Sequence, residues 1–256
     1  MLETRNMIKA ERHDTILSEL AKRGAISVQE LSNLLHVSEA TVRRDLTELD
    51  ERSLVQRTHG GAALLEGDEL PFSSKITAHL AEKRRIGAVA ASLILPGSVI
   101  GCSGGTTVIQ VMKALKGKAV RVITNAVNVA MEFAHSPETE VLVTGGFFRG
   151  RTYELVGRVA ERTLNEVNLD IALVGIDGLS IERGLTTYNQ AEAYVSHELV
   201  ARAREVWAVA DYSKLGLVKP AVMAPLEKLT RLVTDASAPS DFVARLRDAG
   251  VDVVLA

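Results

Sequence analysis

Residues 27–49 read SVQELSNLLHVSEATVRRDLTEL, and this stretch holds two short helical patterns that are separated only by a tight turn. Ser27 and Glu30 have the spacing of a capping box, in which each side chain bonds the backbone amide of the other residue, so the first helix is predicted to begin here. Four apolar residues would lie on one face of that helix: Val28, Leu31, Leu34 and Leu35. Ser38 is a second N-cap, and it predicts the start of the next helix.

The helix that begins after Ser38 is predicted to have two unlike faces. Its core face carries Val42, Leu46 and Leu49, and its opposite face carries Thr41, Arg44 and Glu48, with Arg43 on the flank. A short arginine-bearing face near a helix N-terminus can enter a DNA major groove, where Arg pairs with guanine and Ser or Thr contacts a phosphate or a base edge. A helical hairpin with solvated arginines has the same spacing. Charge does not separate the two interpretations, because residues 1–60 hold nine Lys and Arg against ten Asp and Glu.

The segments on either side of this pair favour the DNA-binding interpretation. Before it, three apolar residues have helical spacing: Ile16, Leu17 and Leu20. Gly24 ends that helix. After it, residues 54–58 and 62–65 are predicted to be two strands around a His-Gly-Gly turn. A hairpin beside a helix-turn-helix is a wing, and Arg57 and His59 at its tip could contact phosphates or the minor groove, although His59 could equally be a solvated turn residue.

Composition is that of an ordinary globular protein. The chain has 256 residues, of which 46% are hydrophobic and 24% charged, with a net charge of -2, which suits one large domain or two smaller ones. Cys102 is the only cysteine, so no internal disulfide can form and a reducing cytoplasm is the expected location. No signal peptide or membrane-length apolar run is recognised, so no membrane association is expected, and Met1 and Met7 are alternative starts.

The remainder of the chain is predicted to be a second domain. Residues 66–79 are polar and are predicted to be a linker, and a helix at about 80–95 follows whose basic EKRR start is interpreted as a solvated helix end. Apolar runs of strand length then recur: VIGC, VRVIT, EVLVTG, IALVGI, EVWAVA, RLVTD and VDVVLA. Helices are expected between many of them, at about 107–115, 128–134, 158–167, 190–203 and 239–248.

This alternation predicts a doubly wound α/β domain, with a mainly parallel sheet that is covered on both faces. The predicted organisation is a winged helix-turn-helix domain at 1–65, a linker at 66–79 and the α/β domain at 80–256. No internal repeat or low-complexity segment is found.

Ligands of such folds bind at the carboxyl ends of the strands, and polar residues gather at those ends here. After VIGC comes the run Ser103, Gly104, Gly105, Thr106 and Thr107. Its glycines and the amides of the following helix would suit a phosphate, although a tight strand-to-helix turn can have the same sequence. Other strand ends carry Asn125; Gly145, Gly146, Arg149, Tyr153 and Glu154; Asp177 and Gly178; and Asp211, Ser213 and Lys214. Each alone is typical of a turn, but together they predict a pocket for an anionic small molecule.

The segment from ERHDTILSEL to the HGGA turn, with SEATVRRDL inside it, resembles the winged helix of the DeoR family of bacterial transcriptional regulators. This resemblance covers about fifty residues without a gap. It implies that the DNA-recognition residues are Ser38, Thr41, Arg43 and Arg44. Ser27 at the start of the preceding helix, together with Arg57 and His59 in the wing, completes the predicted DNA-contacting set.

The second domain resembles the sensor domain of the same family, which is similar in fold to ribose 5-phosphate isomerase and binds phosphorylated sugars. The matching pieces are SGGTT, ITN, VTGG, YELVG, GIDG, GLTTYN with QAEA, ADYSK and VTD, in that order. The resemblance implies a phosphate site at 103–107, sugar hydroxyl contacts from Asn125, Asp177 and Glu192, and Lys214 near the anion or a hydroxyl. Ser103 departs from the acidic residue that many members carry there, which puts the usual hydroxyl contact in doubt.

Two functions are compatible with these patterns. The first is a homo-oligomeric transcription factor, a repressor of a sugar-metabolism operon that a phosphorylated sugar releases from its operator. The alternative is an isomerase-like enzyme acting on a phosphosugar, with Asp177, Glu192 and Lys214 as acid and base groups. No catalytic residue, metal-ligand cluster or cofactor motif is predicted, so the regulator is favoured. Cys102 beside the SGGTT run is expected to be a buried small residue, with a redox-sensing thiol as the alternative.

Overall fold

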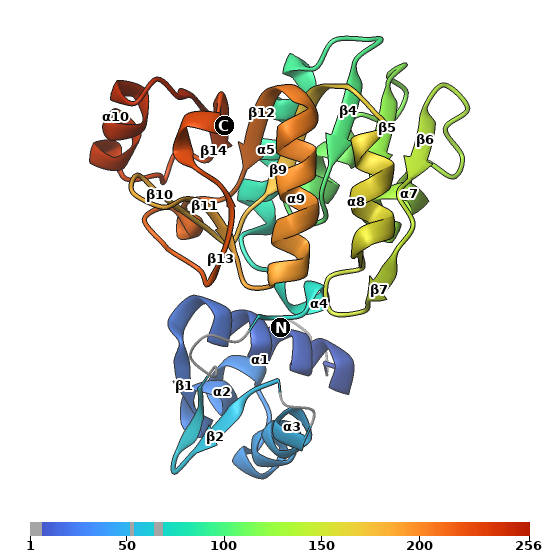
Figure 1. The fold of residues 1–256 in the computed structure, drawn as a ribbon. Helices are drawn as coiled ribbons and strands as arrows, with labels where there is room; N and C mark the ends of the chain where they lie inside the picture. The colour runs from blue at the N-terminus through green and yellow to red at the C-terminus, as the bar shows by residue number, and fades with distance from the viewer. Residues whose placement is uncertain (1–6, 52–53, 64–68) are drawn as a thin grey trace. The chain divides into compact units, whose positions relative to one another are not determined.

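The computed structural model describes residues 7–51, 54–63 and 69–256, and the chain divides into two units, Met1–Ala78 and His79–Ala256 (Figure 1). The predicted linker region near this division is only partly covered, because residues 66–68 lie outside the described residues. Residues beyond them form a short helix, α4 (Phe72–Lys75), in which Phe72 is buried. This helix contacts α1 (Lys9–Arg23). The domain limits at 65 and 80 therefore stay a proposal.

The described residues of the N-terminal unit form three longer helices and a small sheet in addition to α4. Helix α1 ends at Gly24, as predicted, and is followed by β1 (Ala25–Ser27), α2 (Val28–Leu35) and α3 (Glu39–Glu51). Strands β2 (Gln56–Thr58) and β3 (Gly61–Ala63) form the wing hairpin, and β1 pairs with β3 in the order β1-β3-β2. The sequence did not predict β1, because three residues are too few to show a strand period. Strand β2 is shorter than expected, and the predicted end of the second strand at Leu65 lies outside the described residues.

The core of this unit follows the predicted helical faces with one exception. Ile16, Leu20, Leu31, Val42 and Leu46 are buried together with the other members of the cluster. Leu34 was predicted to lie on the buried face of α2, but it is exposed. The helix has only eight residues, and Val28, Leu31 and Leu35 at helical spacing already fill the face that meets the core.

The larger unit confirms the predicted α/β class. All seven predicted strands are present: β4 (Val99–Cys102), β5 (Arg121–Thr124), β6 (Glu140–Val143), β9 (Leu169–Gly175), β12 (Ala203–Val209), β14 (Arg231–Thr234) and β15 (Asp252–Leu255). They form one sheet in the order β15-β14-β12-β9-β4-β5-β6, and every neighbouring pair is parallel. The chain order reverses between β4 and β9, so ligands of such a sheet are expected at the carboxyl ends of these two neighbours.

Helices cover both faces of the sheet (Figure 1). One layer contains α8 (Arg158–Asn165) and α9 (Gln190–Arg202), and the other contains α5 (Leu80–Leu93), α6 (Val108–Ala114) and α7 (Val127–Glu132). Helix α10 (Ser240–Asp248) packs near β15. The predicted helix limits are correct to within about two residues.

Two pieces of the larger unit were not predicted. A hairpin of β7 (Phe147–Arg149) and β8 (Glu154–Val156) follows β6, and a separate antiparallel sheet joins β10 (Gly178–Ser180), β11 (Gly184–Thr187) and β13 (Ala221–Ala224). The basic start of α5 was also misjudged, because Lys83 is buried, with its Nζ 3.9 Å from Asp211 Oδ2. A buried counter-charge far along the chain cannot be inferred from a local run of basic residues.

Candidate functional site

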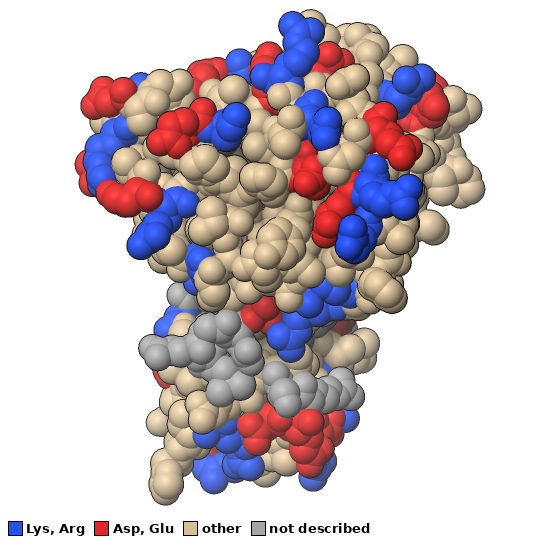
Figure 2. All heavy atoms as spheres, viewed as in Figure 1, with Lys and Arg blue, Asp and Glu red and all other residues tan. Residues whose placement is uncertain are grey.

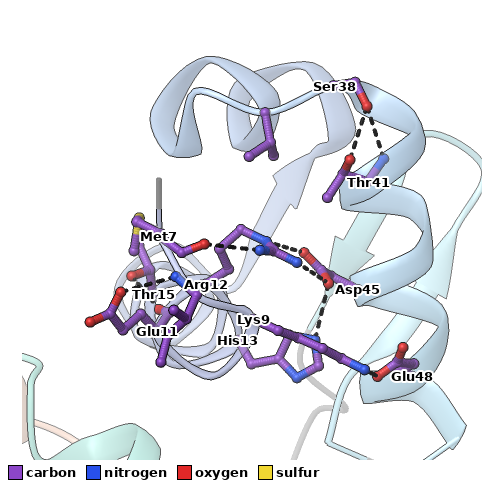
Figure 3. A network of polar contacts seen from close by, with 12 residues as sticks. Met7, Lys9, Glu11, Arg12, His13, Thr15, Ser38, Thr41, Asp45 and Glu48 are labelled. Atoms are coloured by element: carbon purple, nitrogen blue, oxygen red, sulfur yellow. Dashed lines mark hydrogen bonds and ion pairs between the residues drawn. The ribbon is translucent and has the colours of Figure 1, made fainter. Parts of the chain in front are cut away.

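The start of the recognition helix α3 is held by Ser38. Its hydroxyl oxygen accepts a hydrogen bond from the Thr41 amide at 3.2 Å and lies 3.0 Å from the Thr41 hydroxyl (Figure 3). This is the N-cap that the sequence predicted. Both hydroxyls lie at the N-terminal end of α3, which is the end that a DNA groove would receive. Their contact with DNA stays a prediction.

The two adjacent arginines of α3 have different surroundings. Arg43 is exposed and pairs with Glu39 one turn earlier, at 2.9 Å between Nη2 and Oε2. Arg44 is exposed as well, and among the described residues it makes no ion pair or hydrogen bond. Arg44 can reach a base edge without giving up a contact, whereas Arg43 must first leave Glu39, at a small cost because exposed pairs are weak.

The buried carboxylate of Asp45, one turn after Thr41 in α3, was not predicted. The Asp45 side chain accepts from Arg12 at 2.7 Å (Nε to Oδ2) and 2.9 Å (Nη2 to Oδ1), and His13 Nε2 lies 3.3 Å from Oδ1 (Figure 3). The hydrogen bond to Asp45 raises the pKa of the Arg12 guanidinium. Lys9 and Glu48 add a further pair between α1 and α3. These contacts tie the recognition helix to α1 through charged groups as well as through the apolar core.

The sequence held one signal for this network. Position 45 falls on the same helical face as Val42 and Leu49, so a charged residue there required a buried partner. The partner could not be named, because Arg12 and His13 lie more than thirty residues earlier in the chain.

Ser27 is engaged as the predicted cap of α2. Its hydroxyl oxygen accepts from the Glu30 amide at 3.2 Å, and Glu30 Oε2 accepts from the Ser27 amide at 2.9 Å and from its hydroxyl at 2.6 Å. These hydrogen bonds lower the pKa of Glu30. The capping box is therefore confirmed, and the proposed DNA contact of Ser27 stays a prediction.

The wing residues are exposed. The Arg57 Nη1 donates to Thr47 Oγ1 of α3 at 3.1 Å, and His59 lies in the hairpin turn. Figure 2 shows acidic and basic side chains intermingled on the visible face of this unit. Attraction to DNA phosphates must therefore come from particular oriented side chains rather than from the net charge of the unit.

At the carboxyl edge of the large sheet, the SGGTT run bridges β4 and β9. The Ser103 hydroxyl accepts from the Gly175 amide at 3.1 Å and donates to the Gly104 carbonyl at 3.2 Å. Ser103 is buried, so this hydroxyl is used by the backbone of the two central strands. Gly105 has a φ of +125°, which side-chain-bearing residues rarely adopt, and the run enters α6 directly after it.

A carboxylate and an amide lie against this run. A Cβ added to Gly104 would overlap the Glu154 carboxylate and lie 2.7 Å from Glu154 Cγ. Asn125 Nδ2 donates to Glu154 Oε2 at 3.4 Å and to the Leu155 carbonyl at 3.1 Å. The buried Asn125 Oδ1 has no hydrogen-bond partner within the described chain. Glu154 thus supplies a carboxylate beside the SGGTT run, and Asn125 offers an acceptor to a ligand hydroxyl.

Two predicted groups are occupied by protein contacts. Glu192 accepts from Arg149 Nε at 2.9 Å and from the Thr152 hydroxyl, so its carboxylate is already neutralised. Asp177 accepts from the Thr187 hydroxyl at 3.0 Å and lies 4.0 Å from Lys214 Nζ. Arg149 is thus paired with Glu192 and Lys214 with Asp177, and a ligand contact from any of these four residues stays a prediction.

Other predicted site residues have structural surroundings. A Cβ on Gly146 would lie 2.7 Å from the Val156 carbonyl, and one on Gly178 would lie 2.6 Å from the Leu217 carbonyl. Gly145 lies against Val159, and the Tyr153 ring stacks on Phe148 with 6.3 Å between ring centroids. These contacts explain the residue types without a ligand, so their ligand contacts stay predictions.

Cys102 has the environment of a small core residue. It is fully buried, and this burial raises the pKa of its thiol to about 12. A thiol that stays protonated at neutral pH is a poor nucleophile, which disfavours the redox-sensor alternative.

The described residues provide neither a metal site nor a membrane-spanning helix. No group of three His, Cys, Asp or Glu side chains is placed so that it could hold a metal ion. Among the helices of the described chain, none combines the length and apolar character needed to cross a membrane.

Comparison with known proteins agrees with this architecture. Residues 12–67 match the DeoR-like helix-turn-helix domain, and residues 78–236 match the DeoR C terminal sensor domain. The HTH-type transcriptional regulator GlpR of Haloferax volcanii is 36% identical over 97% of this chain and 98% of its own length. The glycerol-3-phosphate regulon repressor of Escherichia coli is 30% identical over 97% of this chain and 100% of its own.

A solved structure, ribose 5-phosphate isomerase from Methanocaldococcus jannaschii, is 19% identical, with a TM-score of 0.41 over 54% of this chain and 55% of that one. A likeness of that degree carries no functional argument. The relatives that match over nearly the full length are regulators, so the isomerase-like alternative is not carried further.

Proposed function

Because the chain belongs to the DeoR family of transcriptional regulators, we propose that it represses a sugar-metabolism operon and that a phosphorylated sugar releases it from its operator. Repression is supported by the name of the Escherichia coli relative, a repressor of a glycerol-3-phosphate regulon. The protein acts as a homo-oligomer in the cytoplasm, so that two recognition helices engage two half-sites one helical turn apart or a multiple of it.

The DNA-binding part of the proposal rests chiefly on two neighbouring residues of α3. Asp45 anchors the helix to α1 through Arg12, while the Arg44 side chain is exposed and makes no ion pair or side-chain hydrogen bond within the described residues. A rigid helix that presents an arginine with no competing partner is what bidentate guanine recognition requires.

The effector part rests on the carboxyl edge of the sheet. Gly104 and Gly105 carry no side chain, so a phosphate can approach the backbone of the SGGTT run closely, and Asn125 Oδ1 is a buried acceptor that a sugar hydroxyl can satisfy. Glu154 and Asp177 are further acceptors in reach of the same edge, and Lys214 beside Asp177 adds a cation. A phosphorylated sugar combines the anion and the hydroxyls that these groups would bind.

Arg44→Ala tests the DNA contact. We expect it to weaken operator affinity by about 1–3 kcal/mol, measured by fluorescence anisotropy at fixed salt, because it removes one base contact. Arg204→Ala, which removes an exposed arginine in the other unit, is the matched control and should leave affinity unchanged. A loss of only a few tenths of a kcal/mol for Arg44→Ala would remove Arg44 from the recognition set.

A thermal-shift screen tests the effector. A phosphosugar at 100 times its dissociation constant adds about 2.7 kcal/mol of stability, whereas its unphosphorylated counterpart should add little. Thr106→Ala and Lys214→Ala should keep operator binding but weaken release by that phosphosugar. Unchanged release in both variants would show that the effector binds elsewhere.

A further inference from the structure

The end of the large sheet carries an exposed apolar surface that neither proposed site uses. It consists of Leu142 and Val143 in β6, Phe147 and Phe148 in β7, and Val159 at the start of α8, and is called the edge patch here. Phe147 is 80% exposed, Phe148 56% and Val159 58%.

Val159 and Phe147 of the edge patch each lie against a glycine of the neighbouring turns. A Cβ on Gly145, between the two strands, would lie 3.3 Å from Val159, and one on Gly157 would lie 3.4 Å from the Phe147 ring. Thr163 of α8 donates to the Thr144 carbonyl at 2.8 Å, which holds the helix against the same turn. In Figure 1 these elements lie together at one end of the sheet.

Exposure of this kind indicates an interface. Two adjacent phenylalanines in contact with solvent are unfavourable for a monomer, and aromatic residues are enriched in the centres of protein interfaces. At roughly 200 Å² for a ring, the exposed part of Phe147 alone offers roughly 160 Å². That is about a fifth of the ~800 Å² that each partner buries in a stable dimer, and β6 and Val159 extend the surface.

The edge strand points to a second copy of this chain as the partner. Within residues 79–256, which are all described, β6 pairs only with β5, so its outer row of backbone groups is open. Monomeric proteins protect such edges with Lys, Pro or bulges. Here the one charge in β6, Glu140, is neutralised by Arg121 of β5, with Nε and Oε2 2.8 Å apart.

An antiparallel pairing of β6 with its own copy satisfies this edge. Across a two-fold axis, each copy presents the same patch to the other, so one strand and one set of aromatic side chains suffice for both halves of the interface. We propose that the edge patch is the surface through which two copies of this chain associate.

The same hairpin also reaches the proposed effector site. Arg149 follows Phe148 in β7 and pairs with Glu192, and across the hairpin it stands opposite Glu154, which lies against Gly104. The association surface and the ligand groups are thus consecutive residues of one strand. On the proposed function, this link would let the effector alter how the two copies hold their recognition helices.

Sedimentation velocity of the full chain, with neither DNA nor sugar present, tests the association. We expect the wild type to be a dimer or larger at micromolar concentration. Phe147→Glu and Val159→Glu should each raise the dissociation constant by about 30-fold or more, the scale of an interface hot spot. Leu95→Glu is the matched control, because Leu95 is 72% exposed in the turn after α5, away from the edge patch, and it should leave assembly unchanged.

Three results would overturn the proposal: a monomeric wild type at 100 times the working concentration, wild-type assembly in both patch variants, or equal dissociation by Leu95→Glu. Circular dichroism and a melting curve for each variant show that it is folded. Wild-type assembly in both patch variants would refute the edge patch alone and leave the proposed homo-oligomeric repressor standing, whereas a monomeric wild type would count against both. Conversely, the patch could pass this test even if no phosphosugar binds.

Discussion

Replacing Asp45 is the most informative perturbation of the recognition helix. The Asp45 side chain is 2% exposed and the Arg12 side chain 14%, so Asp45→Ala would leave a guanidinium without its carboxylate in a largely dry place. Removing one partner of a buried pair costs about 3–5 kcal/mol. Arg12 retains some access to water and donates a hydrogen bond to the Met7 carbonyl at 3.1 Å. The free energy of unfolding should therefore fall by an amount near the lower end of this range, about 3 kcal/mol.

The two units allow this loss to be measured separately. The only tryptophan, Trp207, lies in β12 of the larger unit, so its fluorescence in a urea titration reports on that unit. Far-ultraviolet circular dichroism in the same titration reports on both units. Asp45→Ala should move an early part of the dichroism transition to lower urea and leave the tryptophan transition in place. Glu39→Ala, an exposed acid in the same helix, should cost only about 0.5 kcal/mol.

A double variant separates charge from geometry. Arg12→Met with Asp45→Leu replaces both members by apolar side chains, a change that is often neutral or stabilising in other buried pairs. If the double variant is stable but binds operator DNA weakly, the pair positions the helix for recognition. If Asp45→Ala costs no more than Glu39→Ala, the reasoning about the buried pair is refuted.

Other predictions follow from single contacts. Gly61→Ala should destabilise the wing by about 1–3 kcal/mol in thermal melts, because its Cβ would overlap the Ile26 carbonyl. Gly60→Ala is the control and should not destabilise the wing, because the space around Gly60 is open. Equal effects of the two variants would disprove the packing argument. Ser27→Ala should lower the free energy of unfolding by about 0.5–2 kcal/mol. The stabilisation by this cap should be complete above the ordinary carboxyl pKa and should be lost as the pH falls through the lowered pKa of Glu30. The Cys102 thiol should react with a disulfide reagent at pH 8 about a thousandfold more slowly in the native protein than in urea, because burial raises its pKa to about 12; a native rate near the urea rate would contradict its burial.

Local sequence patterns predicted the elements well, for physical reasons. The capping box at Ser27 and the N-cap at Ser38 act over three residues, so their effect is visible in the sequence itself. Runs such as VIGC and EVWAVA are buried on both faces, so continuous apolar character identified them as parallel strands. The strand ends could then be expected to meet at one edge.

Contacts between distant parts of the chain were not predictable in the same way. Lys83 with Asp211 and Asp45 with Arg12 are buried pairs, and nothing near either member in sequence names its partner. The β7–β8 hairpin was missed because each of its strands has only three residues, too few to show a strand period in the sequence. As a result, the sequence identified Glu154 as a strand-end residue but could not place it against Gly104.

The contact between Gly104 and Glu154 has an evolutionary consequence. Because Glu154 occupies the space that a side chain at 104 would need, position 104 cannot gain a side chain unless Glu154 moves or is replaced by a shorter residue. Across related sensor domains, members with a larger residue at 104 should carry a shorter one at 154, so the two positions should vary as a pair. Ligand preference in this lineage would then shift by paired substitutions. A protein that had gained a side chain at 104 but still carried Glu154 would be a less stable intermediate.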